Sequence, residues 1–207
     1  MVIILEKKIN ERSSIRLNGK DLITIGIFSS IYFVINIIFM MLGIIPVMWI
    51  LMPGFIALFS GIPFMLLCTK VQKPGAVLIM GFITGFIYFI TGQFTAIILI
   101  TFTIGCVLGE VLRGITKYNS FKGNAVAFAL FSLGMTGSPL PIWIFRDSFF
   151  VQITKQGMSL DYINSLQKLA SNEMLIVLFV APIIGAVISS IVTSKIFKKH
   201  FVKAGIV

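Results

Sequence analysis

The stretch LITIGIFSSIYFVINIIFMMLG, Leu22–Gly43, decides the fold, because it carries no charged residue over a length that crosses a bilayer. A spanning helix needs about 20 mostly apolar residues. Five more apolar stretches follow, so the sequence predicts an all-α, polytopic membrane bundle of six transmembrane helices. Pro53 and Pro63 predict a kink or break in the second span. The later predicted spans are Ile45–Cys68, Gly75–Thr91, Phe94–Leu112, Asn124–Phe145 and Met174–Phe197.

Composition supports this class. Hydrophobic residues make up 57% of the chain and charged residues 12%, about half of the roughly 25% that soluble domains carry. The mean hydropathy is +1.04. A soluble fold of this length has no means of hiding so much apolar surface, whereas lipid solvates it. The net charge of +10 lies in short clusters between apolar stretches, so we expect the lipid bilayer, and no nucleic acid, as a partner.

The basic residues predict an orientation. If the chain crosses at every predicted span, fourteen Lys and Arg fall on one side and three on the other. Cytoplasmic segments are enriched in Lys and Arg, so both termini are expected in the cytoplasm. The predicted organisation is a basic cytoplasmic arm (1–21), a membrane domain (22–197) and a basic cytoplasmic tail (198–207).

The membrane domain includes a long extracellular loop at 146–173. Within it, Ser159 is a candidate N-cap for a short helix in which Tyr162, Leu166 and Leu169 share one face. Such a helix either lies on the membrane surface or folds over the bundle.

Enzymatic signatures are missing from the sequence. It contains no HExxH, GxSxG or Walker-type motif, and the one histidine, His200, lies in the basic tail. Glu110 lies one turn before Arg113, which predicts an i,i+3 ion pair at a helix end. We therefore expect no enzyme activity, no cofactor and no metal. The predicted spans also lack the mid-membrane ionisable groups of ion-coupled carriers.

Polar residues gather in the outer halves of the predicted spans. Pro139 and Pro141 have no backbone N–H, so carbonyl oxygens of the preceding turn are left without a donor. In a membrane such carbonyls must face protein or a cavity. We predict a small outward-facing substrate pocket, in which an arginine would meet an anionic group of the ligand. The alternative for each residue is a local helix end or interface. The candidates are Asn36, Tyr88, Gln93, Thr95, Thr136, Ser138, Arg146 and Asp147.

Small residues mark one face of the first span. Gly26 and Ser30 are four residues apart, with Ser29 beside them. This spacing lets two helices approach closely, so it predicts either a partner-docking surface or packing within the bundle.

Four stretches carry a resemblance to a known family: Asn18–Thr24 (NGKDLIT), Met52–Phe55 (MPGF), Lys73–Gly75 (KPG) and Gly134–Trp143 (GMTGSPLPIW). Over essentially its whole length the chain resembles the substrate-binding S components of energy-coupling factor (ECF) transporters. More closely, it is similar to the Trep_Strep or MptD-type family of S components. The resemblance implies an S-component fold and a receptor in the bacterial cell membrane that captures a small, vitamin-like micronutrient.

The resemblance also implies partners: a transmembrane T component and two cytoplasmic ATPase subunits. The docking motif of the family is usually AxxxA on the first helix. Here Gly26 and Ser30 take the place of the alanines.

Three other functions compete with this one. A stand-alone facilitator or secondary carrier would transport solute without an ATPase. A membrane enzyme would turn over lipid, and a scaffold would bind no small ligand.

Overall fold

The computed structural model describes residues 16–90 and 96–197, which form helices and turns and, within these ranges, no strand. The predicted all-α class is therefore confirmed. The longest helices of the described chain are α2 (Gly19–Met40), α3 (Pro46–Lys70), α4 (Ala76–Ile90), α5 (Ala96–Ile115) and α10 (Asn172–Ile196). The shorter elements are η1 (Met41–Ile44), α6 (Phe121–Ser132), η2 (Leu133–Gly137), α7 (Pro141–Ile144), α8 (Arg146–Lys155) and α9 (Leu160–Leu169).

Four segments of the described chain are long and apolar enough to cross a membrane: Gly19–Ile44, Pro46–Lys70, Ala96–Ile115 and Asn172–Ile196. They coincide with the first, second, fourth and last predicted spans. The third predicted span corresponds to α4, an apolar helix of 15 residues. Helix α3 continues through Pro53 and Pro63, so of the predicted kink or break, the break does not occur.

The fifth predicted span is wrong as a continuous helix. Instead of running over 124–145, α6 ends at Ser132 and the chain continues as η2 and the four-residue α7. Pro139 and Pro141 cannot donate the backbone hydrogen bonds that would continue a helix.

Contacts with α5 fix the path of η2. The Thr101 hydroxyl donates a 2.8 Å hydrogen bond to the Gly134 carbonyl oxygen. A Cβ atom on Gly137 would lie only 2.8 Å from the Ile98 Cα. Glycine at 137 therefore lets the two backbones touch, where any side chain would separate them.

Helix α3 is the centre of the bundle. Its span is 61% buried inside the protein, whereas the α2 span is 22% buried. Helix α10 packs against α3 along most of its length. A Cβ atom on Gly185 of α10 would lie 2.5 Å from the Gly54 carbonyl oxygen of α3. The outward face of α2 carries exposed Ile23, Ile27 and Val34, as expected of a surface that lipid solvates.

A group that we call the polar clamp (Glu110, Arg113 and Asn124) lies at one end of the bundle, the clamp end. Arg113 is fully buried. Its guanidinium donates to the Val71 carbonyl oxygen at 2.8 Å and to Asn124 Oδ1 at 3.2 Å. One arginine thus joins the end of α3 to α5 and α6.

Glu110 completes the clamp. Its carboxylate accepts hydrogen bonds from the backbone amides of Gly75 (2.7 Å) and Val77 (2.9 Å), which caps the start of α4. Glu110 Oε2 also lies 3.7 Å from Arg113 Nη1, which confirms the predicted ion pair. The bonds to Val71, Gly75 and Val77 close the end of α3 and the start of α4.

Candidate functional site

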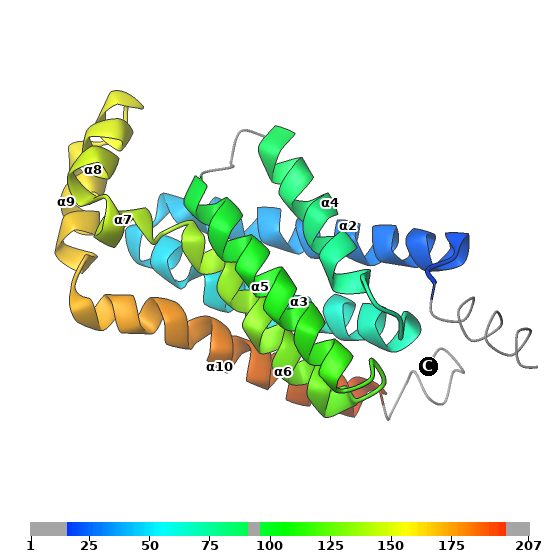
Figure 1. Cartoon of the computed structure of the whole chain (residues 1–207). Helices are drawn as coiled ribbons and strands as arrows, with labels where there is room; N and C mark the ends of the chain where they lie inside the picture. The colour runs from blue at the N-terminus through cyan, green and yellow to red at the C-terminus, as the bar shows by residue number, and fades with distance from the viewer. Residues whose placement is uncertain (1–15, 91–95, 198–207) are drawn as a thin grey trace, which may run out of the picture.

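The opposite end of the bundle is covered by a roof, formed by α8 and α9. Figure 1 shows both helices lying across the end that is remote from the α3–α4 and α5–α6 connections. Helix α9 begins after Ser159, whose side chain accepts from the Tyr162 amide, so the predicted cap and helix are confirmed. Of the two positions expected for α9, the structure has the one over the bundle.

Two contacts attach the roof to the bundle. The Tyr162 hydroxyl donates a 2.7 Å hydrogen bond to the Gly43 carbonyl oxygen. Burial raises the pKa of Tyr162, so the hydroxyl keeps its proton and stays a donor. The rings of Trp49 (α3) and Phe149 (α8) stack with centroids 5.7 Å apart and planes inclined by 13°.

A separate apolar cluster supports the roof from within. It joins the start of α3 to α7, α8, α9 and α10, so the roof has a core of its own. Its buried members are Ile50, Ile142, Phe150, Ile153, Ile163, Leu166 and Leu178.

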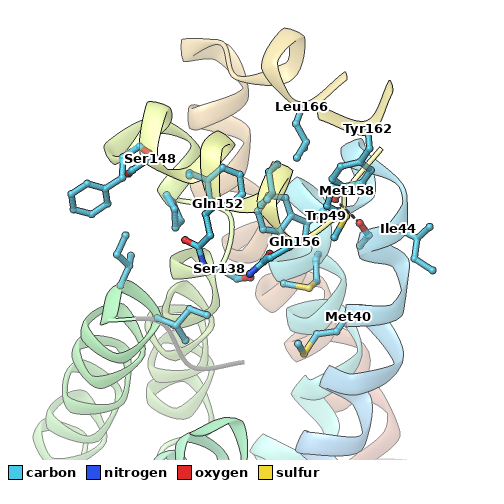
Figure 2. Close-up of a pocket in the computed structure, with 18 of the residues that line it drawn as sticks. Met40, Ile44, Trp49, Ser138, Ser148, Gln152, Gln156, Met158, Tyr162 and Leu166 are labelled. Atoms are coloured by element: carbon cyan, nitrogen blue, oxygen red, sulfur yellow. Dashed lines mark hydrogen bonds between the residues drawn. The ribbon is translucent and has the colours of Figure 1, made fainter. Parts of the chain in front are cut away.

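A cavity of about 820 Å³ lies between the roof and the bundle (Figure 2). Its volume falls within the roughly 300–1,000 Å³ typical of small-molecule sites. The described residues that line it include no Asp, Glu, Lys, Arg or His. Apolar walls come from Met40, Trp49, Met52, Ile98, Phe149 and Leu166. Polar groups come from Ser138, Ser148, Gln152, Gln156, Ser159 and Tyr162.

Two glutamines give the cavity most of its hydrogen-bonding capacity. Gln152 and Gln156 are four residues apart on α8, so they share one face. Figure 2 shows their amide groups directed into the cavity on the side of Ser138. Neither amide makes a hydrogen bond with the residues that the structure describes.

The structure places the predicted pocket residues in different parts of the molecule. Ser138 lines the cavity. Asn36 and Tyr88 lie elsewhere, in the α2–α4 interface, where the Tyr88 hydroxyl donates to Asn36 Oδ1 at 3.0 Å. Thr136 is buried and donates to the Leu133 carbonyl oxygen. Gln93 and Thr95 lie outside the described residues.

Arg146 and Asp147 lie in the roof but do not line the cavity. Arg146 donates to the carbonyl oxygens of Ala170 (3.3 Å) and Gln167 (3.2 Å). Its guanidinium therefore holds α8 against the end of α9, and Asp147 is exposed. The arginine that was expected to meet an anionic ligand has a structural role in this arrangement.

The candidate docking residues lie on two different faces of α2. Ser29 is buried and donates to the Ile25 carbonyl oxygen. Ser30 is exposed, and nothing lies within 4 Å of a Cβ atom placed on Gly26. The Gly26–Ser30 pair is thus open on the outward face of α2, whereas Ser29 packs inside the bundle.

The sequence reasoning missed α8 and with it Gln152 and Gln156. A signal was present: Phe149, Phe150 and Ile153 repeat at helical spacing. Asp147 in the first turn and the lysine in the last suit the helix dipole.

An all-helical bundle with four helices able to cross a bilayer is a polytopic membrane protein. Residues 19–203 match the model of the family described as "Hypothetical bacterial integral membrane protein (Trep_Strep)", and the chain belongs to this family. The Trep_Strep part of the expected resemblance is thereby confirmed. No curated protein and no solved structure matches the chain.

Proposed function

We propose that the protein is the substrate-binding S component of an ECF-type ABC transporter in the bacterial cell membrane. It captures a small, vitamin-like micronutrient at the outer face, and partner subunits import it at the expense of ATP. The observation that carries this proposal is the roofed cavity of about 820 Å³, which lies at the end of the bundle poor in Lys and Arg. A cavity roofed by two helices suits capture of a small molecule.

The orientation follows from charge. Arg146, Lys155 and Lys168 belong to the roof, whereas the other fourteen basic residues belong to the remaining connections and the two ends of the sequence. By the positive-inside rule the roof faces outward and both termini are cytoplasmic. In this topology α4 and the segment α6–η2–α7 are the third and fifth of six crossings.

The α2 surface supports docking on a T component. Gly26 and Ser30 leave a shallow, open strip between exposed isoleucines. A partner helix approaches such a strip closely and gains packing contacts that lipid does not supply. ATP hydrolysis is assigned to two cytoplasmic ATPase partners, because the sequence has no Walker motif.

Affinity purification from native membranes tests the proposal. One T component and two ATPases are expected to co-purify with the tagged wild-type chain. The variant Gly26→Leu/Ser30→Leu fills the strip and is expected to lose all three. Thr103→Leu, which adds bulk at an exposed site on α5, is the matched control and keeps them. A folded chain that comes alone and supports uptake by itself in vesicles would replace the proposal with a stand-alone facilitator or carrier.

Cysteine labelling tests the orientation. The native Cys68 and Cys106 are buried, so they contribute little background. In intact cells an impermeant maleimide is expected to label Ser165→Cys in the roof and to leave Lys122→Cys at the start of α6 unlabelled. The reverse pattern would invert the topology and overturn an outward-facing cavity.

A further inference from the structure

The charged residues of the roof are kept out of the cavity. Arg146 is engaged by two carbonyl oxygens, and its guanidinium carbon lies 6.0 Å from the centre of the Phe150 ring. Asp147, Lys155 and Asp161 are exposed and do not line the cavity. An ionised ligand would lose hydration on entry and find no ion partner among the described lining residues. The lost hydration would not be offset, so binding of an ionised ligand here is unfavourable.

The polar groups that face the cavity are neutral, and each can both donate and accept hydrogen bonds. Each glutamine amide offers two donor hydrogens and an acceptor oxygen, and Ser138 offers a hydroxyl. Gln152 and Gln156 are one helical turn apart, so a single ligand group can contact both. Neutral groups that both donate and accept, such as an amide, a lactam or a ring carbonyl beside an N–H, match this lining.

The apolar part of the cavity has flat walls. Trp49 and Phe149 present a stacked pair of rings, and Tyr162 adds a third ring from α9. Aromatic rings pack well against other planar rings in offset or edge arrangements. Met40 lies below Trp49 and Tyr162 in Figure 2, and Met52 also lines the cavity. Methionine adapts its shape to irregular ligands.

We propose that the cavity selects an uncharged molecule with a planar ring and an amide-like edge, held by Gln152, Gln156 and the Trp49–Phe149 pair. This inference rests on the proposed function and specifies its substrate class. It replaces the expected anionic ligand, because the arginine on which that expectation depended points to carbonyl oxygens outside the cavity.

The test uses the full chain in lipid nanodiscs and the small-molecule extract of cells of the source bacterium as the probe. Ion exchange at pH 7 divides the extract into neutral, anionic and cationic fractions. Thermal stabilisation of the chain is measured against dilutions of each fraction. The neutral fraction is expected to stabilise the wild-type chain. Gln152→Leu/Gln156→Leu is expected to need at least about tenfold more of it, since two hydrogen bonds are lost.

Gln167→Leu is the matched control, because it makes the same change on α9, outside the cavity, and keeps the carbonyl that Arg146 contacts. It is expected to respond like wild type. Stabilisation by a charged fraction, no stabilisation by any fraction, or equal responses of the double variant and the control would each overturn the inference. Partner recovery is read separately: a charged ligand with T component and ATPases present refutes only the substrate class, whereas a neutral ligand without partners refutes only the transporter assignment.

Discussion

The clamp end and the roof end of the bundle use polar side chains in opposite ways. At the clamp end, Glu110, Arg113 and Asn124 are buried and bonded to one another and to backbone groups of α3 and α4. At the roof end, the side-chain amides of Gln152 and Gln156 face a cavity and make no hydrogen bond with a described residue. Buried polar groups are normally satisfied by the protein itself. The polar groups of the clamp end join helix ends, whereas the two exposed amides of the roof end are open to a ligand, as our proposal requires.

The largest expected effect is at the clamp. Arg113→Met removes the cation and leaves Glu110 buried, which costs about 3–5 kcal/mol of unfolding free energy for a broken buried pair. Arg146→Met in the roof is the matched substitution and costs about 1 kcal/mol or less, because its two hydrogen bonds are exposed. Detergent-titration unfolding of both variants measures the contrast. Equal losses would show that the two ends do not differ in this way.

A smaller effect is expected in the α2–α4 interface. Tyr88→Phe removes the donor to Asn36 Oδ1, which costs about 1–3 kcal/mol when a buried acceptor loses its partner. Ligand binding should stay within twofold of wild type, because neither residue lines the cavity. A variant that is stable but fails to bind would move the site toward Asn36.

The sequence predicted the spanning helices well, but it did not determine which candidate residues line one cavity. Long apolar stretches locate spanning helices by length alone, and α2, α3, α5 and α10 follow them. The fifth stretch also carries no charged residue, yet Gly137 and the prolines let it fold against α5 as η2 and α7. Hydropathy contains no information on such close backbone contacts.

The sequence does not determine which residues share a surface where this depends on the rotation of a helix. Asn36 was placed in the pocket by its depth, but its side chain meets Tyr88, 52 residues away. The roof depends on a bond between Tyr162 and Gly43, 119 residues apart. Neither pairing has a local signature. Ser138 does line the cavity, beside the prolines that predicted backbone facing protein or a cavity.

The roof attachment gives a third prediction. Tyr162→Phe keeps the ring and loses the hydrogen bond to Gly43, a change of about 0.5–1.5 kcal/mol. Amide hydrogen exchange should accelerate in 160–169 and remain unchanged in 113–124 at the clamp end. Faster exchange at both ends would mean that the roof is not an independent unit.

The smallest effect on stability is expected at the glutamines. Gln152→Leu and Gln156→Leu should each change the unfolding free energy by less than about 0.5 kcal/mol, as exposed positions without partners usually do. Each single variant should need more of the neutral fraction than wild type for the same stabilisation, and less than the double variant. Asn124→Leu is the contrasting change at the clamp, because it removes an acceptor of Arg113. If the glutamine variants unfold as readily as Asn124→Leu, these amides are structural.

The most direct measurement is hydrogen exchange of the whole chain in nanodiscs, with and without the neutral fraction of the cell extract. We expect protection in 40–52 and 141–169, the segments around the cavity, and no change in 110–124. Protection confined to the clamp end, or to α2 and α4 around Asn36, would contradict a ligand site beneath the roof.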